Sequence, residues 1–213
     1  MNNHLQNAKY LHVQQVLEGF EVVLGWETRN KYRILDENKQ PVAYAAEQEK
    51  SFLSSLMRQF FGHWRSFKVT IFNQQRQPEY YLNFPFRWFF KTLYVSDASG
   101  KPIGKLQQRF ALFRKKFDVY DQHEQLIAKI NSSFFKFWTF EFYQNNRKIG
   151  SIQKKWSGAL FELFTDKDNF VVTFDDMNMS VETKALIMST CLMVDIIYFE
   201  NNTRKGGVID LLD

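Results

Sequence analysis

Side chains that commonly carry catalysis or bind metals are few in this sequence, and they lie far apart. The single cysteine, Cys191, falls inside an apolar stretch, where a thiol is a poor nucleophile. The close glycine pair at Gly206 and Gly207 does not have the pattern of a phosphate-binding loop. The histidines lack metal-ligand spacing; they are His4, His12, His63 and His123. We therefore expect a protein that is not an enzyme and that needs no cofactor.

Basic side chains are the group that could do chemistry, because they are concentrated in the middle of the chain. Residues 84–160 contain 14 Lys or Arg and 5 Asp or Glu, a net charge of +9, whereas residues 161–213 contain 4 and 10, a net charge of −6. This uneven distribution predicts a surface that faces a polyanion. The ten residues that we assign to it are Lys101, Lys105, Arg109, Arg114, Lys115, Lys116, Arg147, Lys148, Lys154 and Lys155.

This basic surface has three interpretations. Lys and Arg next to an anionic membrane gain about 1 kcal/mol each. The same charges on nucleic acid act by releasing counterions from the phosphodiester backbone. They could also be the solvated outer face of β-strands, where charged side chains prevent edge-to-edge pairing.

Two aromatic runs, at 84–90 and 134–138, are interleaved with Arg87, Lys91 and Lys136. We expect these rings to pack in a barrel wall. The alternatives are a wedge at a membrane interface, where Trp and Phe settle at the headgroup level, and a platform that stacks on single-stranded bases.

The elements that must position these side chains are short strands joined by polar turns. Six hairpins are predicted, at 32–35 with 41–45, 67–72 with 80–82, 93–95 with 102–106, 117–120 with 125–130, 140–143 with 148–152, and Phe164 with 170–174. Twelve antiparallel strands would leave a reactive edge unless the sheet closed, so we expect a barrel. A barrel of this size is too wide for side chains alone to fill.

A helix over 181–200 would fill that interior, because its sequence is apolar on every side. Ser180 supplies a start signal. Ala185 to Phe199 is 15 residues and is interrupted by Asp195, whereas a membrane crossing needs about 20 apolar residues. A buried core helix is therefore favoured over a membrane span.

These elements predict one domain over residues 10–200, with a flexible leader at 1–9 and a tail at 201–213. One cysteine excludes an intramolecular disulfide, and residues 1–25 lack a secretory signal pattern. We expect a cytoplasmic monomer, with peripheral membrane association as an alternative.

Several motifs resemble the phospholipid scramblase family in the same order along the chain. They are QQ at 14–15, GWETRNKY at 25–32, VAYAAE at 42–47, IGSIQKKWSG at 149–158, FTDKDNF at 164–170 and VDIIYFE at 194–200. The resemblance covers roughly residues 10–200 and implies the tubby-like superfold, a twelve-stranded barrel around a central C-terminal helix. In tubby proteins a basic pocket on the barrel holds phosphoinositide headgroups, so the resemblance also implies lipid binding.

The resemblance suggests further roles and shows one departure. The family has a loop proposed to bind Ca²⁺, and Asp166 and Asp168 match its first acidic positions, with Asp176 as a late ligand. A simple β-turn is the alternative. Trp156 and Asp195 match family positions, and we assign both a structural role. Where the family has a palmitoylated cysteine-rich stretch, residues 51–61 contain no cysteine.

Taken together, the sequence predicts a non-enzymatic module that binds anionic, phosphoinositide-like phospholipid through its basic face. The alternative is a DNA-binding protein that uses the same surface.

Overall fold

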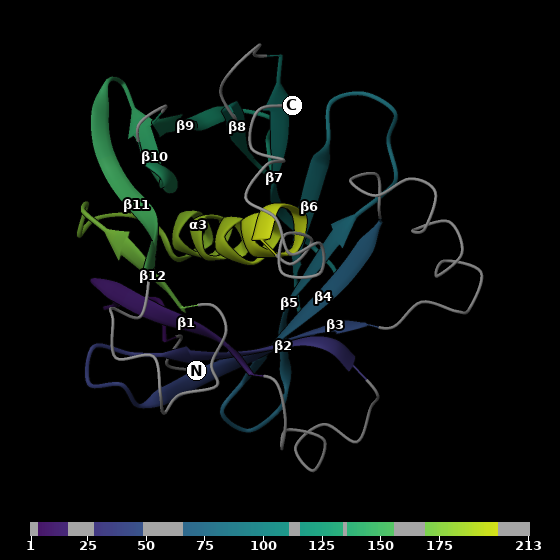
Figure 1. The fold of residues 1–213 in the computed structure, drawn as a ribbon, viewed down its shortest axis with the longest axis vertical. Coiled ribbons are helices and arrows are strands. Elements are labelled where there is room, and N and C mark those ends of the chain that lie inside the picture. The colour runs from purple at the N-terminus through teal and green to yellow at the C-terminus, as the bar shows by residue number, and fades with distance from the viewer. Residues whose placement is uncertain are drawn as a thin grey trace.

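The computed structural model describes residues 4–16, 28–48, 66–110, 116–133, 136–155 and 169–199. Within them, twelve antiparallel strands form a closed barrel around one helix, as Figure 1 shows, which confirms the expected fold class. The strands are β1 (Tyr10–Val16), β2 (Thr28–Leu35), β3 (Pro41–Gln48), β4 (Phe67–Asn73), β5 (Pro78–Phe84), β6 (Thr92–Asp97), β7 (Pro102–Arg109), β8 (Lys116–Asp121), β9 (Leu126–Ser133), β10 (Lys136–Gln144), β11 (Arg147–Lys155) and β12 (Asn169–Phe174).

Strand β1 closes the barrel, because it pairs with β2 on one edge and with β12 on the other. Five of the six predicted hairpins are present as β2–β3 to β10–β11. The sixth is wrong. Its opening residue, Phe164, lies outside the described residues, and β12 has both edges occupied by β1 and β11. The first strand of the chain takes the place that we had assigned to residues near 164.

The central helix α3 (Val181–Val194) continues as a π-helical turn, η1 (Asp195–Phe199). Ser180 caps its start, since its hydroxyl accepts a hydrogen bond from the Thr183 backbone N–H at 3.2 Å. Every residue from Lys184 to Val194 is buried, as an all-apolar helix in a core requires. None of the described helices is long and apolar enough to cross a membrane.

Two glycines allow the helix to approach the barrel wall closely. A Cβ on Gly104 of β7 would lie 2.8 Å from Leu186 Cδ1 and 2.3 Å from the Tyr120 carbonyl oxygen. A Cβ on Gly150 of β11 would lie 2.6 Å from the Thr173 carbonyl oxygen and 3.5 Å from Ile187 Cδ1. The helix therefore packs where the wall has no side chains to displace it.

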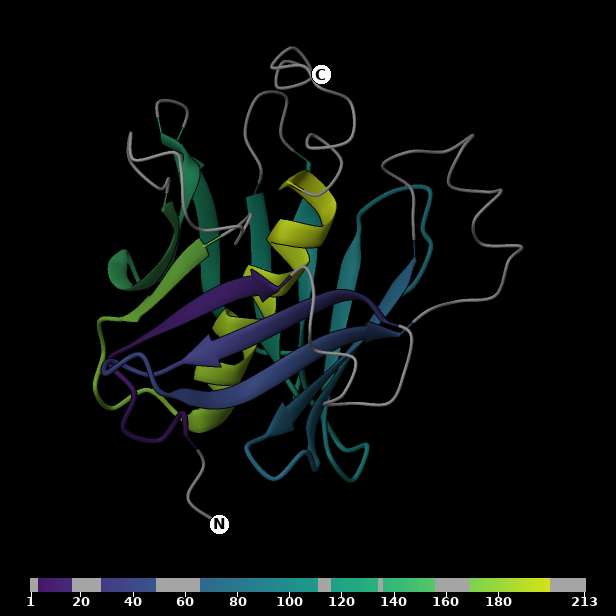
Figure 2. The same ribbon diagram turned by 60° about the horizontal axis from the view of Figure 1, so that its bottom comes forward.

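The barrel has two different ends. The turns of the five hairpins lie at one end, which we call the hairpin rim, and α3 begins there (Figure 2). The opposite end of the barrel, the loop rim, is where β1, β3, β5, β7, β9 and β11 end and where the strand after each of them begins. At four hairpin turns one side-chain oxygen accepts backbone N–H groups two or four residues ahead. These residues are Asp36, Asn73, Asp97 and Asp121.

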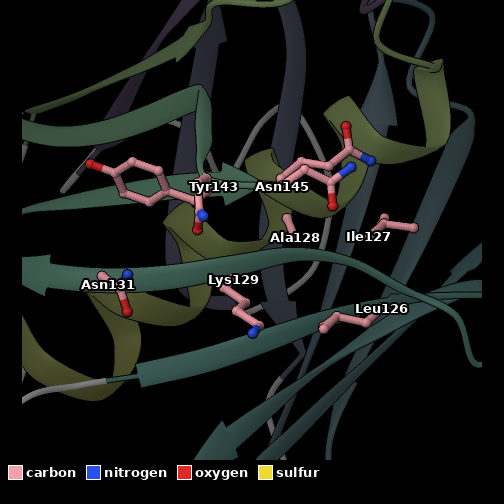
Figure 3. Close-up of a pocket in the computed structure, with 9 residues that line it drawn as sticks. Leu126, Ile127, Ala128, Lys129, Asn131, Tyr143 and Asn145 are labelled. Atoms are coloured by element: carbon pink, nitrogen blue, oxygen red, sulfur yellow. The ribbon is translucent and has the colours of Figure 1, made fainter.

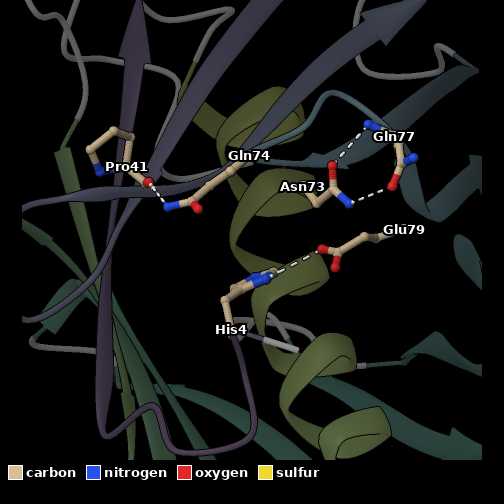
Figure 4. Close-up of polar contacts among 6 residues, drawn as sticks. All are labelled: His4, Pro41, Asn73, Gln74, Gln77 and Glu79. Atoms are coloured by element: carbon tan, nitrogen blue, oxygen red, sulfur yellow. Dashed lines mark hydrogen bonds and ion pairs between the residues drawn. The ribbon is translucent and has the colours of Figure 1, made fainter. Parts of the chain in front are cut away.

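Residues 4–9, which we expected to form a flexible leader, instead pack against the barrel. Leu5 is fully buried in the core. His4 Nδ1 lies 3.3 Å from a Glu79 carboxylate oxygen on β5 (Figure 4). Lys184 Nζ donates to the carbonyl oxygens of Gln6 and Ala8, at 3.0 Å each. The buried Leu5 side chain and the hydrogen bonds from Lys184 hold this segment against the barrel. The expectation of a flexible leader is therefore wrong for residues 4–9.

Figure 4 also shows how neighbouring hairpins are linked at the hairpin rim. Gln74 donates a hydrogen bond of 2.6 Å to the Pro41 carbonyl oxygen, which joins the β4–β5 turn to the start of β3. Asn73 and Gln77 bond across their own turn, with Asn73 Nδ2 donating to Gln77 Oε1 at 3.2 Å. These contacts stiffen the rim where the helix begins.

Part of the interior near the loop rim is polar. Asp195 is 1% exposed, and its Oδ2 accepts a hydrogen bond of 2.7 Å from the Tyr32 hydroxyl. One layer further along, Gln15 donates to Asn30, and Asn30 donates to a Glu47 carboxylate oxygen at 2.6 Å. A buried charge needs such partners to be tolerated. Asp195 has such a partner in Tyr32, and its structural role stays a prediction.

Candidate functional site

The predicted basic residues do not form one patch, because the strand directions divide them between the two rims. Lys101, Lys105, Arg147 and Lys148 lie at or near the hairpin rim. Lys105 is ion-paired with Glu124 and lies 5.3 Å from the Tyr120 ring centroid. Acidic residues surround this rim, so its positive charge is largely balanced.

One further hairpin-rim pair shows the same balance. Lys148 Nζ lies 3.4 Å from an Asp175 carboxylate oxygen.

Asp176, the proposed late Ca²⁺ ligand, accepts a hydrogen bond of 3.0 Å from the Asn178 backbone N–H. The parts of the chain that the structure describes contain no group of three or more potential metal-ligating side chains. Asp166 and Asp168 lie outside them, and the Ca²⁺ site stays a prediction.

Four of the other predicted basic residues lie at the loop rim. Arg109 and Lys116 face each other across β7 and β8, and Lys154 and Lys155 end β11. Lys154 Nζ lies 5.6 Å from the Trp138 ring centroid and 5.7 Å from that of Phe170, a cation–π arrangement. Arg114, Lys115 and Trp156 lie outside the described residues.

The loop rim also contains cations that the sequence analysis did not assign to the surface. Lys68 on β4 and Arg87 before β6 are exposed, and Lys91 is half-buried. Burial lowers the pKa of Lys91 below its usual value. The sequence could have assigned these three residues to this rim. Each lies between two predicted hairpins, and consecutive antiparallel hairpins place such positions at the end of the barrel opposite the hairpin turns.

Acidic side chains at the described part of the loop rim are buried or paired. Glu47 is 5% exposed and accepts a hydrogen bond from Asn30. Asp118 lies 2.9 Å from Arg109 Nε, and burial raises the pKa of its carboxyl while the Arg109 charge opposes that shift. The accessible charge of the described loop rim is therefore positive.

Next to these cations, the β5–β6 connection exposes aromatic side chains. Their exposed fractions are 41% for Phe86, 62% for Trp88, 80% for Phe89 and 50% for Phe90. We expected the aromatic run at 84–90 to pack in the barrel wall, and this is wrong except at Phe84, which is 3% exposed. The rings after Phe84 follow the end of β5 and no longer face the core. In the second run, residues 134 and 135 lie outside the described residues.

A shallow cavity of about 260 Å³ lies between the end of this aromatic connection and the Arg109–Asp118 pair. Its lining includes Phe90, Arg109, Phe110, Asp118 and Tyr120. Phe110 directly follows β7 and is 77% exposed. The loop rim therefore combines exposed rings with a cation at one place.

A larger cavity, of about 540 Å³, lies between β9 and the β10–β11 turn (Figure 3). Figure 3 shows Lys129, Asn131, Tyr143 and Asn145 around it. The Tyr143 hydroxyl donates to Glu141 at 2.9 Å, and this bond raises the pKa of the phenol. Amide side chains line much of the cavity, and none of the eight predicted basic residues that the structure describes lies in its lining.

Comparison with known proteins identifies relatives along almost the whole chain. The Scramblase family model matches residues 2–201. A phospholipid scramblase family protein of Schizosaccharomyces pombe is 28% identical over 92% of this chain and 60% of its own length. Human phospholipid scramblase 1 is 28% identical over 96% of this chain and 68% of its own length. The chain thus spans roughly two thirds of these curated relatives.

Two further similarities were found. The altered inheritance rate of mitochondria protein 25 of Saccharomyces cerevisiae is 24% identical over 92% of this chain and 72% of its own length. A solved structure of an Arabidopsis thaliana protein is 11% identical, with a TM-score of 0.47, and the match covers 90% of this chain and 94% of that one.

Proposed function

Since this chain belongs to the Scramblase family, we propose that it is a non-enzymatic module that binds anionic phospholipid at membrane surfaces through its loop rim. Family membership supports a function connected with phospholipid. The observation that carries the proposal further is the separation of charge between the rims. Lys105 and Lys148 at the hairpin rim are paired with Glu124 and Asp175. At the described loop rim, the accessible acid Asp118 is paired with Arg109, and Lys68 and Lys155 are exposed.

Electrostatic attraction favours an anionic membrane surface as the partner of the loop rim. Each Lys or Arg beside an anionic leaflet contributes about 1 kcal/mol, and the attraction fades within a Debye length. Cations spread over several connections at one end of a barrel can approach a plane together, while those at the opposite end cannot. Phosphoinositide is the headgroup that we propose to be preferred, because its phosphates offer the densest negative charge.

Paired charge reversals test the choice of rim. Lys116→Glu with Lys155→Glu should weaken binding to vesicles containing phosphatidylserine or phosphoinositide by about thirtyfold or more, since at least two favourable contacts are lost. Vesicle co-sedimentation at physiological salt measures this. Lys101→Glu with Arg147→Glu is the matched control, because it makes the same charge change at the hairpin rim and should leave binding nearly unchanged.

Competition with DNA tests the alternative partner. The same cations attract phosphodiesters, so duplex and single-stranded DNA are added to protein bound on anionic vesicles. Binding that survives DNA supports the lipid module. Release by DNA, with equal affinity for neutral and anionic vesicles, would reject it in favour of nucleic-acid binding. Equal losses from both charge-reversal pairs would reject the loop rim as the binding surface.

A further inference from the structure

The β5–β6 connection, residues 85–91, has exposed aromatic side chains on a backbone that is anchored at both ends. Connections are usually polar, yet this one has four aromatic rings that are at least 41% exposed. Among large apolar side chains of the described residues, the highest exposed fractions are those of Phe89 at 80% and Phe110 at 77%. Both lie at the loop rim, so the apolar surface is concentrated at one end of the barrel.

Both ends of this connection are anchored. At its start, Phe84 is buried and stacks on Phe67, with ring centroids 4.6 Å apart and planes 13° from parallel. At its end, the Lys91 carbonyl oxygen accepts a 2.8 Å hydrogen bond from the Gln108 backbone N–H. Thr92 is 5% exposed. The connection is therefore a defined projection from the wall.

Within the connection, contacts hold the rings outward. Phe86 and Trp88 pack edge to face with centroids 5.4 Å apart. Arg87 Nη2 donates a 2.9 Å hydrogen bond to the Tyr94 hydroxyl on β6, which holds the guanidinium along the wall. Phe90 has a φ of +49°, a left-handed conformation that is unfavourable for a bulky residue. Such strain is characteristic of functional segments.

From this geometry we propose that the β5–β6 connection is a membrane wedge: Trp88 and Phe89 enter the interface between headgroups and acyl chains, while Arg87 and Lys91 contact phosphates. This inference rests on the proposed binding of anionic phospholipid and adds an apolar contribution to it. Trp and Phe with neighbouring cations have the composition of interfacial anchors, whose binding grows with both buried apolar area and charge. Phe110 lies on the same cavity as Phe90 and Arg109, and would enter beside the wedge.

A site-specific label tests insertion directly. The chain has one cysteine, Cys191, which is fully buried and whose thiol pKa is raised by burial, so a thiol-reactive dye modifies an introduced cysteine selectively. Bimane on Phe89→Cys should shift to shorter wavelength with phosphatidylserine vesicles and be quenched by brominated acyl chains. Bimane on Gln122→Cys, at the exposed hairpin rim, should do neither.

A second pair of variants measures the apolar contribution. Trp88→Ser with Phe89→Ser should weaken vesicle binding about tenfold or more, and the loss should persist at high salt because apolar burial is not screened. Leu126→Ser with Met177→Ser also removes two exposed apolar side chains, but at the hairpin rim, and should have little effect. All four side chains are exposed, so the fold should be retained.

The outcomes separate the two proposals. If the vesicles bind the protein but the label at 89 stays in water, the wedge is rejected while binding by the basic rim stands. If neither the vesicles nor the label responds, the proposed function itself is rejected. Vesicle binding that is unchanged in the Trp88 and Phe89 variant would also reject the wedge.

Discussion

Lys184 is a charged residue type that is usually exposed, yet its side chain lies in the core. It begins the apolar stretch of the helix and is completely buried. Its ammonium group donates to the carbonyl oxygens of Gln6 and Ala8 and lies 5.4 Å from the Phe174 ring centroid. Burial lowers the pKa of this amine below its usual value of 10.5. A single side chain thus joins residues 6–8 to the start of α3.

This lowered pKa predicts a pH dependence of stability. Between the pKa of the folded protein and the unfolded value of 10.5, the unfolded chain binds more protons at Lys184 than the folded one. The contribution of this residue to the free energy of unfolding therefore rises with pH across that window and falls as pH decreases through the folded pKa. Urea unfolding of the wild type and of Lys184→Met between about pH 8.5 and 10 measures the difference.

The comparison with Lys184→Met is needed because other groups titrate nearby. The pKa of Lys91 is lowered and those of Tyr143 and Tyr198 are raised, but these shifts occur in both proteins. As pH rises over this range, the free energy of unfolding of the wild type should thus increase relative to that of Lys184→Met. A difference that stays constant over this range would contradict the assignment. No sequence pattern predicts this contact, because its partners lie 176 and 178 positions away.

Among the elements, β7 shows how the wall and the helix fit each other. Gly104 lies against both β8 and α3, so Gly104→Ala must push apart the Tyr120 carbonyl and Leu186. We expect a loss of about 2 to 3 kcal/mol in the free energy of unfolding, as in an overpacked core. Gly100→Ala is the control. Its Cβ would meet nothing within 4 Å, and only its φ of +86° is unfavourable, so it should cost about 1 kcal/mol.

Thermal and urea unfolding measure both variants. Equal losses would mean that backbone conformation, rather than the contact with the helix, limits residue 104. The sequence predicted five hairpins and the helix correctly, but not this contact. Alternating apolar residues and turn signals are local, whereas the closest approach of helix and wall depends on the barrel's final curvature.

The aromatic run at 84–90 shows the same limit at the level of an element. Its composition is that of a core strand, and we predicted core packing for it. The alternation ends at Phe84, because the next residues continue as Pro85 and Phe86 without the one-in, one-out pattern of a strand. Pro85 was the usable signal, since proline is uncommon inside a paired strand.

For the whole molecule, strand polarity explains why the described members of the predicted basic surface lie at two ends of the barrel. Lys101 and Lys116 belong to one basic run in the sequence, but Lys101 follows a hairpin turn and Lys116 follows a loop-rim connection. Antiparallel strands send such positions to opposite ends of the barrel. Once the hairpins were predicted, the ten residues could have been sorted by rim. The pairing of β1 with β12, the seam of the barrel, could not have been predicted from the sequence, because it joins segments about 160 residues apart.

That seam leads to a prediction about cooperativity. Because β1 is bonded to β2 and β12, it has no free edge, and its amide hydrogens should exchange as slowly as those of β8 and β9. Val172 is fully buried on β12 and pairs with Leu11. Val172→Ala should cost about 2 kcal/mol and lower protection in all of these strands together. If β1 exchanged rapidly in the wild type, or if Val172→Ala released β1 alone, the seam would be a latch on an open sheet and the barrel would not unfold as one unit.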